Sequence, residues 1–318
     1  MDGSTPKNHD IVVDELIEGR RDEVKKESVG WIGTGVMGNA MCAHVLEAGY
    51  DVHVYNRTRL KTAELCDNGA CWCDSPQEVA RKSDIVFSIV GFPEDVENII
   101  LGEAGILAHA REGTVIVDMT TSQPTLARKI YAQAKAGGIN ALDAPVSGGD
   151  IGARQGTLAI MVGGDKQSYD RVLPLFMLMG ENIAYMGEAG KGQHTKMSNQ
   201  ILIASTMIGV VESLLYACKA GLDLDQVIDV IGKGAASSWS INNLGRRIVQ
   251  GNFDPGFFIK HFIKDMGIAL EEAKHMKLAL PGLSMVHQFY LAASALGYDD
   301  LGTQGLYKVF QHMNDISA

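Results

Sequence analysis

The chain has 318 residues, of which 46% are hydrophobic and 21% charged; this composition is typical of soluble globular proteins, and the length allows two domains. Its 38 acidic residues outnumber its 28 basic residues, which gives a formal net charge of −10. This balance argues against a general nucleic-acid surface, which binds phosphates through Lys and Arg, but it is compatible with a small anionic ligand.

The N-terminal segment, residues 1–27, has more acidic than basic residues and no apolar centre. A transit peptide is rich in Arg and poor in acidic residues, and a secretory signal needs an apolar run. We therefore expect a flexible acidic tail and a cytoplasmic protein. Residues 201–211 form the most apolar stretch, but Glu212 closes it before the ~18 uncharged residues of a membrane span are reached.

From Ser28 onward, short apolar runs alternate with stretches of helical periodicity. Such alternation predicts parallel strands joined by crossover helices, which form a doubly wound α/β sheet. The runs that we expect to form strands are 28–35, 51–56, 70–75, 85–90, 114–119, 139–142, 158–162 and 183–186.

The hexapeptide GTGVMG lies between the first predicted strand and the first predicted helix. In such a loop the first Gly allows a tight turn, the second lets a pyrophosphate approach the backbone, and the third lets helix and strand pack closely. The amides at the helix N-terminus then face the phosphates. The sequence therefore predicts a dinucleotide-binding loop made by Gly33, Thr34, Gly35, Val36, Met37 and Gly38.

The end of the second predicted strand carries Asn56, Arg57 and Thr58. An NAD enzyme usually has Asp or Glu there, which binds the ribose 2′-hydroxyl. An Arg without a carboxylate suits a 2′-phosphate, which a guanidinium holds with two parallel hydrogen bonds. These residues favour NADP(H) as cofactor and leave NAD(H) possible; the alternative is that Arg57 is an ordinary solvated side chain.

The five cysteines give no disulfide framework, because their number is odd and their spacing irregular. Cys66, Cys71 and Cys73 could be interpreted as a metal cluster. Cys-x4-Cys-x-Cys is not a usual zinc spacing, however, and the sequence around Cys71 is typical of a strand. We therefore expect no metal site.

After residue 192 the predicted strands stop and only helices follow. Residues 195–221 form one long predicted helix that is apolar nearly all round, which implies burial on several sides. We therefore divide the chain into the acidic tail (1–27), a sheet domain (28–190) and an all-helical domain (191–318).

A second group of candidate residues lies at the start of this long helix. Lys196, Asn199 and Gln200 are three and four residues apart, so they share one helix face and can point into one pocket. Gly192, one turn earlier, would leave room for a ligand, whereas His194 should point to a different face. Lys196 could be a solvated lysine, but the helix is otherwise apolar and starts at the domain junction, where ligand clefts form.

The segment 143–158, DAPVSGGDIGARQGTL, is rich in glycine. A glycine cluster costs conformational entropy on folding, so it marks backbone that turns sharply or lies against another group. The glycines could merely allow a turn between the domains, or they could expose backbone amides to a ligand.

Four stretches, in this order, resemble the β-hydroxyacid dehydrogenase family, which includes 3-hydroxyisobutyrate dehydrogenase and the glyoxylate/succinic semialdehyde reductases. They are GWIGTGVMGNAM (30–41), DAPVSGGDIGARQGTL (143–158), GKGQHTKMSN (190–199) and KDMGIAL (264–270). The resemblance covers the chain from Val29 to the C-terminal helices. It implies a Rossmann domain followed by a helical domain, and an NAD(P)-dependent enzyme that interconverts a short aldehyde acid and its hydroxy acid.

The same resemblance implies that Ser147, Gly148 and Gly149 hold the substrate carboxylate through the Ser hydroxyl and backbone amides. Successive glycine amides can form an anion-binding concavity, which agrees with this role.

By the same resemblance, Lys196 is the general acid/base and Asn199 orients the substrate or the lysine. Many family members have a second Asn where this chain has Gln200, so which of the two amides contacts the substrate stays open. Thr121 takes the place of a Thr that contacts the nicotinamide ribose, and Lys264 that of a cofactor-contacting Lys. Phe257 matches an aromatic residue that closes over the site.

Other family features are less definite in this chain. Gly91 and Phe92 depart from the Leu-Pro that the family often carries beneath the nicotinamide. The substrate could be glyoxylate or a succinic, methylmalonate or tartronate semialdehyde. We expect Trp239, Ser240, Asn243 and Phe257 to discriminate among them.

The resemblance also implies a homodimer or homotetramer that assembles through the helical domain, without nucleic-acid or membrane partners. Two alternatives stay open. Imine reductases have a similar architecture but commonly lack the lysine and the Ser-Gly-Gly site, and a dinucleotide-binding scaffold would not turn over a substrate.

Overall fold

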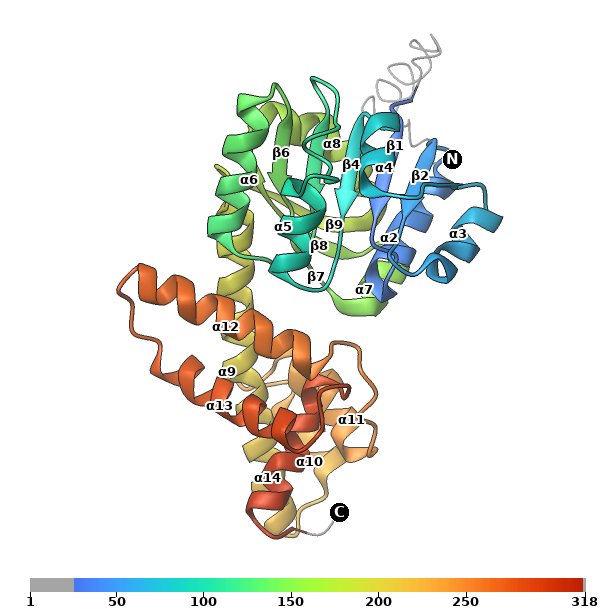
Figure 1. Cartoon of the computed structure of the whole chain (residues 1–318). Helices are drawn as coiled ribbons and strands as arrows, with labels where there is room; N and C mark the ends of the chain where they lie inside the picture. The colour runs from blue at the N-terminus through green and yellow to red at the C-terminus, as the bar shows by residue number, and fades with distance from the viewer. Residues whose placement is uncertain (1–25, 317–318) are drawn as a thin grey trace, which may run out of the picture.

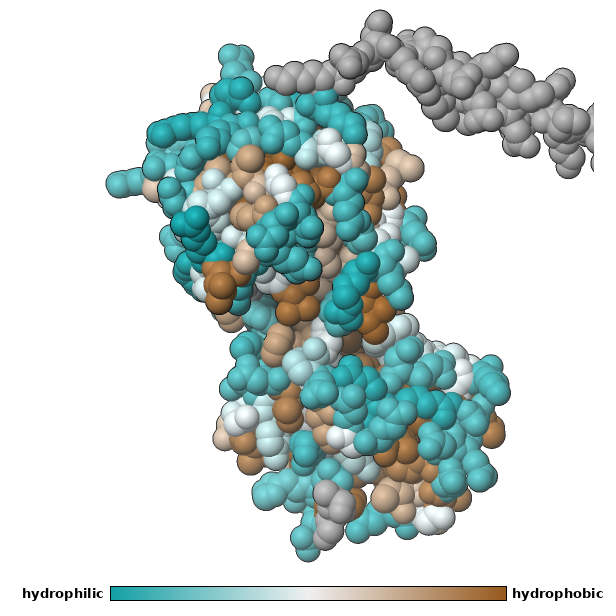
Figure 2. Space-filling model, turned by 90° about the vertical axis from the view of Figure 1, so that its right-hand side faces the viewer, coloured by the Kyte–Doolittle hydropathy of each residue, from teal (hydrophilic) through white to brown (hydrophobic). Residues whose placement is uncertain are grey.

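The computed structural model describes residues 26–316, so the expected acidic tail lies almost wholly outside the described part. Two bodies are joined by one long helix (Figure 1). A space-filling view shows a waist between them (Figure 2). The elements of the sheet domain are β1 (Val29–Ile32), α2 (Val36–Glu47), β2 (Val52–Tyr55), η1 (Arg59–Thr62), α3 (Ala63–Asp67), β3 (Cys71–Trp72), α4 (Pro76–Lys82), β4 (Ile85–Ser88), α5 (Pro93–Leu101), β5 (Val115–Asp118), α6 (Pro124–Ala136), β6 (Asn140–Asp143), β7 (Val146–Ser147), α7 (Gly149–Gln155), β8 (Leu158–Gly164), α8 (Lys166–Met179) and β9 (Gly180–Gly187).

The nine strands form one sheet in the order β3-β2-β1-β4-β5-β6-β8-β7, with β9 beside β8. Strands β1 to β6 pair in parallel, and the chain first winds outward from β1 through β2 to β3 and then returns to β4 on the other side of β1. In a doubly wound sheet, ligands bind where this direction reverses, outside the carboxyl ends of the strands. In this sheet the reversal lies between β1 and β4, so a ligand is expected beyond the carboxyl ends of these two strands.

The sheet is buried on both faces at its centre, where every residue of β1, β4 and β5 is buried. Along β4, Ile85 and Phe87 join the core beneath α2 and α8, whereas Val86 joins the core beneath α4, α5 and α6. This alternation follows from the two-residue period of a strand and produces a three-layer α/β/α domain.

At the edge of the sheet formed by β6, β7 and β8, the strand directions differ from the parallel pattern predicted from the sequence. Strand β8 runs antiparallel to both β6 and β7. The reason is the turn at Gly148 and Gly149, where φ is 135° and 63°, so the chain reverses without a long crossover helix.

The helical domain begins with α9 (Lys191–Lys219), which starts four residues before the predicted helix and ends two residues before its predicted end. The remaining elements are α10 (Leu224–Ile231), a π-helix η2 (Ser240–Gly245), α11 (Arg246–Val249), α12 (Ile259–His275), α13 (Pro281–Ala295), η3 (Thr303–Gly305) and α14 (Leu306–Met313). The core of this domain includes Val211 and Leu214 of α9 and the buried rings of Phe262 and Tyr290, which lie edge to face.

Among the described residues, α9 is long and apolar enough to cross a membrane by length and composition alone. A core helix of a soluble protein passes the same test. Here the N-terminal part of α9 packs on β8 and the rest of the helix packs against α12 and α13. Packing inside the protein thus explains part of its apolar composition, while Leu202 and Tyr216 of the same helix are exposed.

Candidate active site

The glycine-rich loop after β1 has the backbone geometry that its sequence predicts. Gly33 has a φ of 97°, and a Cβ there would lie 2.1 Å from the carbonyl oxygen of Ile89. A Cβ on Gly38 would lie 2.1 Å from the carbonyl oxygen of Gly33, so the helix could not approach the loop. At Gly35, in contrast, no described atom lies within 4 Å of a Cβ position. The first and third glycines serve packing, and the second exposes the backbone.

The N-terminus of α2 is open to an anion. Gly35 is its N-cap and provides no side-chain cap, and the first turn contains no acidic residue. Its unpaired amides carry the positive end of the helix dipole. Val36 is exposed at this end, whereas the half-buried Met37 packs against the core beneath the helix.

Thr34 and Asn56 hold the loop to the end of β2. The Thr34 amide donates a 3.1 Å hydrogen bond to Asn56 Oδ1, and Asn56 Nδ2 donates to the Thr58 carbonyl at 2.9 Å. The side chain of Asn56 thus links the two cofactor segments predicted from the sequence. The Thr34 hydroxyl oxygen is buried and has no hydrogen-bond partner among the described residues.

Arg57 projects from the end of β2 into solvent, with 87% of its side chain exposed. Its closest acidic partner is Asp95 of α5, at 3.5 Å. An exposed pair at this distance contributes little to stability, so the guanidinium can turn toward a ligand at small cost.

A buried carboxylate lies at the carboxyl end of β5. Asp118 Oδ1 accepts hydrogen bonds from Ser88 Oγ at 3.0 Å and from the Thr120 amide at 3.2 Å. Burial raises the pKa of Asp118 to about 6, although these bonds favour the charged form. The Thr120 hydroxyl in turn accepts from the Val90 amide at 3.0 Å, so the loops after β4 and β5 are held together.

A second buried carboxylate fixes the start of α9. Asp143, at the end of β6, accepts hydrogen bonds from the amides of Gly190 at 2.7 Å and Gln193 at 2.8 Å. Burial raises its pKa to about 6. The fully buried Gln193 side chain also accepts from the Ser122 amide at 3.0 Å and donates to the Thr120 carbonyl at 2.7 Å. The sequence interpretation had no role for Asp143 or Gln193, because their partners are distant in the chain.

The prediction that Gly192 leaves room for a ligand is wrong. A Cβ there would lie 2.3 Å from the Met161 carbonyl oxygen and 2.6 Å from that of Asp143. The glycine lets α9 lie directly on the backbone of β6 and β8. His194 points elsewhere and has its Nε2 3.3 Å from Arg128 Nη1 on α6.

Lys196, one turn into α9, is 7% exposed. Burial lowers the pKa of its ammonium to about 8, because desolvation disfavours the charged form; nearby Asp265 opposes this shift and Lys264 adds to it. Among the described residues, its ammonium has no hydrogen-bond acceptor and no ion-pair partner within 4 Å. A buried lysine of this kind is available for proton transfer near neutral pH.

A chain of polar groups runs beside Lys196, from the half-buried Asn199 to the buried Gln200 and Asp265. Asn199 Nδ2 donates to Gln200 Oε1 at 2.7 Å, and Gln200 Nε2 donates to Asp265 Oδ2 at 2.6 Å. Asp265 is 1% exposed and its other oxygen lies 3.0 Å from Lys264 Nζ. The sequence noted Asp265 only as a neighbour of Lys264; here it joins α12 to the polar face of α9.

Lys264 also crosses between the domains. Its ammonium donates a hydrogen bond of 2.5 Å to the carbonyl of Thr121, in the loop after β5. A second contact between the domains is aromatic: the rings of Phe92 and His261 have centroids 5.4 Å apart. The predicted cofactor residues Thr121 and Lys264 are thus brought together, and His261 is an addition that the sequence did not suggest.

The Ser-Gly-Gly segment faces the helical domain. Ser147 ends β7 and is half-buried, and Gly148 and Gly149 form the turn into α7. A Cβ on Gly149 would lie 3.9 Å from the carbonyl oxygen of Gly256, in the loop before α12. The positive φ angles explain the glycines as turn residues, and the exposed Gly148 leaves the amides of this turn accessible.

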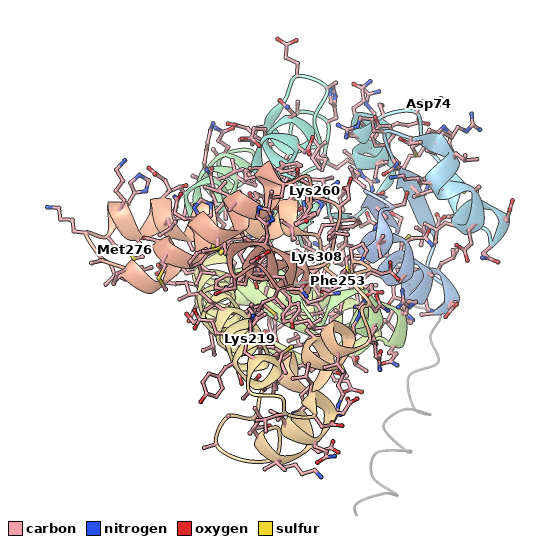
Figure 3. The ribbon with its side chains drawn as sticks, turned by 90° about the horizontal axis from the view of Figure 1, so that it is seen from below. Asp74, Lys219, Phe253, Lys260, Met276 and Lys308 are labelled. Carbon is pink, nitrogen blue, oxygen red and sulfur yellow. The ribbon has the colours of Figure 1, made fainter. Side chains whose placement is uncertain are left out.

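The loop before α12 is held to its own domain by aromatic contacts. Lys308 lies 4.6 Å from the ring centroid of Phe253, and the two are close to each other in the view from below (Figure 3). Phe257 lies edge to face with Phe262, at 5.7 Å between ring centroids. In this arrangement the Phe257 ring packs against the helical core, next to the Gly256 backbone that meets Gly149.

The three other expected specificity residues lie at the π-helix that packs on α9. Trp239 is 63% exposed, Ser240 is buried, and Asn243 Nδ2 donates to the Trp239 carbonyl at 2.9 Å. Short π-helical segments are frequent at functional sites.

Two family profiles together match most of the chain. One, described as the NAD binding domain of 6-phosphogluconate dehydrogenase, matches residues 28–187. The other, described as NAD-binding of NADP-dependent 3-hydroxyisobutyrate dehydrogenase, matches residues 190–310.

Curated relatives match over nearly their full length. An uncharacterized oxidoreductase, YkwC, of Bacillus subtilis is 52% identical over 90% of this chain and 99% of its own. A probable 3-hydroxyisobutyrate dehydrogenase-like protein of Arabidopsis thaliana, named as mitochondrial, is 51% identical over 91% of this chain and 87% of its own. The 2-hydroxy-3-oxopropionate reductase of Escherichia coli is 38% identical over 90% and 97%.

Solved structures of similar proteins have the same fold. A Mycobacterium tuberculosis 3-hydroxyisobutyrate dehydrogenase with L-serine has a TM-score of 0.82 at 29% identity, over 90% of this chain and 99% of its own. Psf3 in complex with NADP⁺ and 2-OPP has a TM-score of 0.83 at 25% identity, over 89% and 99%. An imine reductase from Myxococcus stipitatus is 18% identical with a TM-score of 0.61, over 90% and 99%, which is a likeness of fold alone.

Proposed function

The chain belongs to the β-hydroxyacid dehydrogenase family of NAD(P)-dependent oxidoreductases, whose members act on small hydroxy acids, and from this premise we propose a specific reaction for it. The protein interconverts a short aldehyde acid and its hydroxy acid with NADP(H), and Lys196 is the general acid/base. The observation that carries this proposal is the buried Lys196, with its pKa lowered to about 8, at the start of the helix that joins the two domains.

The residues present fit a pyridine nucleotide. The open space at Gly35, the uncapped N-terminus of α2 and the unpartnered Thr34 hydroxyl all suit a bound phosphate or ribose beyond the carboxyl ends of β1 and β4. We assign the pyrophosphate to the loop from Gly33 to Gly38, and the nicotinamide side to Thr121 and Lys264. When bound, the nicotinamide supplies or accepts the hydride.

Lys196 moves the proton in this reaction. In reduction its ammonium donates a proton to the aldehyde oxygen and stabilises the negative charge that develops there. In oxidation the neutral amine accepts the proton from the hydroxyl group. A pKa of about 8 lets both forms be populated near neutral pH.

Ser147, Gly148 and Gly149 hold the substrate carboxylate in this proposal. The Ser hydroxyl and the amides of the turn donate to it, and glycine leaves these amides unobstructed. Because the same turn meets the loop at Gly256, carboxylate binding would occur between the two domains.

Asn199 is the amide that we assign to the substrate. Each end of the Gln200 side chain already has a partner in the protein, since it accepts from Asn199 and donates to Asp265, and the residue is 1% exposed. Gln200 would therefore act by orienting Asn199. Of the two amides that the sequence left open, we therefore favour Asn199.

NADP(H) is the cofactor that we favour. Asn56, Arg57 and Thr58 present no carboxylate that would repel a 2′-phosphate, and the exposed Arg57 guanidinium can leave its 3.5 Å pair with Asp95 to meet one. The Psf3 structure contains NADP⁺, which supports NADP binding in a protein of this fold.

We also propose a homodimer or homotetramer assembled through the helical domain. Several large apolar side chains of this domain are exposed in the single chain, and apolar patches are visible on its surface (Figure 2). Examples are Leu202, Tyr216, Val230, Met285 and Leu291. We expect a cytoplasmic location; an Arabidopsis relative is named as mitochondrial.

The experiment that tests the proposal is oxidation of NADPH and of NADH with glyoxylate and with succinic, methylmalonate and tartronate semialdehydes. Wild type is compared with Lys196→Ala. We expect one aldehyde to be reduced with NADPH, and the variant to lose about 10²-fold or more in turnover. If wild type binds NADPH but reduces none of them, an imine substrate or a non-catalytic scaffold takes precedence.

A further inference from the structure

A cluster of metal-ligating side chains lies at the β2–β3 edge of the sheet, apart from the active site. The donor atoms of Asp51, His53 and Cys71 all lie within 4.8 Å of one another. We propose that this cluster is a binding site for a divalent metal ion of borderline softness, Zn²⁺ above all.

The strand geometry explains how three distant residues meet. Asp51 and His53 are two residues apart, so they project from the same face of the chain at β2. His53 and Cys71 are register partners in the parallel pair of β2 and β3, so their side chains are neighbours on that face. A carboxylate, an imidazole and a thiolate are all zinc ligands, and three protein ligands leave one position for water.

His53 adds a second, independent observation. Its Nδ1 atom is buried and has no hydrogen-bond partner among the described residues. A buried polar atom without a partner costs about 1–3 kcal/mol. A metal ion bound at Nδ1 would remove this cost, because the ion would then be the partner of that atom.

The surroundings permit a cation. Lys82 of α4 is the nearby ammonium, and it is paired with Glu78 at 2.7 Å. Asp51 and Cys71 are exposed, so both can move toward an ion that enters from solvent. Ligand atoms around a tetrahedral zinc ion lie about 3.3–3.8 Å apart, since each bond is about 2.0–2.3 Å long. A closure of about 1 Å by these side chains would complete the site.

The site differs from the cysteine cluster that the sequence suggested and that we did not expect to bind metal. That cluster grouped Cys66, Cys71 and Cys73 by spacing along the chain, whereas the structure groups Cys71 with residues of another strand. Strand β3 has only two residues, and among the described strands it pairs with β2 alone. A bound ion would fasten this short edge strand to the sheet, independently of catalysis at Lys196.

The test is Zn²⁺ binding to the full chain after removal of metals with a chelator, measured by calorimetry. We expect one ion per chain, a higher melting temperature with Zn²⁺, and at least tenfold weaker binding in Cys71→Ser and His53→Gln. Asp51→Asn changes an exposed ligand, and it replaces either of these variants in the binding measurement if that variant fails to fold. Cys218→Ser, which removes an exposed cysteine of α9, is the matched control and should bind as wild type does.

Replacement of Zn²⁺ by Co²⁺ supplies a spectroscopic readout. Thiolate ligation gives a near-ultraviolet charge-transfer band, which we expect in wild type and Cys218→Ser but not in Cys71→Ser. Unchanged Zn²⁺ affinity in Cys71→Ser and His53→Gln, or a Co²⁺ complex without the thiolate band, would overturn the proposal. Neither result bears on the proposed reductase activity.

Discussion

The glycine loop after β1 and the start of α9 carry the candidate cofactor-binding and catalytic residues, and they are built in opposite ways. The loop offers backbone: Gly33 and Gly38 pack so closely that a Cβ has no room, and Gly35 leaves its surface open. The start of α9 is built from buried side chains. Asp143 of β6 and Gln193 of α9 fix the helix, and Lys196 follows about one turn later. Added atoms should therefore impair packing or nucleotide binding at the loop. Removal of a charge or a hydrogen bond should instead impair activity or stability at the start of α9.

The largest effect that we predict is at Lys196. Lys196→Ala should lower turnover by about 10²-fold or more and leave NADPH affinity nearly unchanged, because the lysine moves a proton and does not bind the nucleotide. Lys191→Ala, at the exposed first residue of the same helix, is the matched control and should retain full activity. Parallel loss of NADPH affinity and turnover in Lys196→Ala would point to a structural role.

The glycine loop permits a paired test of packing against binding. Gly38→Ala places a Cβ 2.1 Å from the Gly33 carbonyl oxygen, so it should lower the free energy of unfolding by about 1–3 kcal/mol and abolish nucleotide binding. Gly35→Ala meets no described atom within 4 Å and has a compatible φ of −71°, so it should fold normally but bind NADPH more weakly. Chemical denaturation and fluorescence titration check the two effects. A Gly35→Ala variant with wild-type affinity would contradict phosphate binding at this loop.

Substitution of Asp143 tests whether its buried carboxylate anchors the start of α9. In Asp143→Asn one of the two oxygens that accept amides of α9 becomes an NH₂ group facing an N–H donor. We expect a loss of about 1–3 kcal/mol in the free energy of unfolding. Asp170→Asn, which removes an exposed ion pair with Lys166, should change it by less than about 1 kcal/mol. Equal effects of the two substitutions would show that Asp143 does not anchor the helix.

The smallest effect concerns cofactor choice. Arg57→Ala should weaken NADPH binding by about tenfold, which corresponds to about 1.4 kcal/mol, and leave NADH binding unchanged. The dissociation constants for NADPH and for NADH are measured on the same preparation, and the NADH value is the control for the NADPH value. If both nucleotides lose affinity equally, Arg57 contacts a group that they share.

The sequence predicted the glycine loop after β1, which is built from backbone, better than the start of α9, which is built from buried side chains. A strand, three glycines and a helix within ten residues define the loop locally, and the close packing at Gly33 and Gly38 and the open space at Gly35 agree with that pattern. The long helix was also predicted, although its start at Lys191 is set by Asp143, which caps it from 47 residues away in the chain.

The contacts around Lys196 could not be predicted in the same way. Gln193 meets Thr120 and Ser122, and Gln200 meets Asp265, across separations of more than 60 residues. A periodic pattern places residues on a helix face but does not say what covers that face. For the same reason Gly192 was assigned to a ligand when it serves backbone packing, and the antiparallel direction of β8 was not foreseen.

The most direct test of the central claim, that buried Lys196 carries the proton, is the pH dependence of single-turnover reduction by NADPH. The ammonium is the acid, and its pKa is lowered to about 8, so the rate of reduction should fall as pH rises through about 8. The reverse oxidation, which needs the neutral amine, should rise over the same interval. A rate of reduction that stays constant from about pH 7 to about pH 10, where Lys196 would lose its proton, would contradict the account.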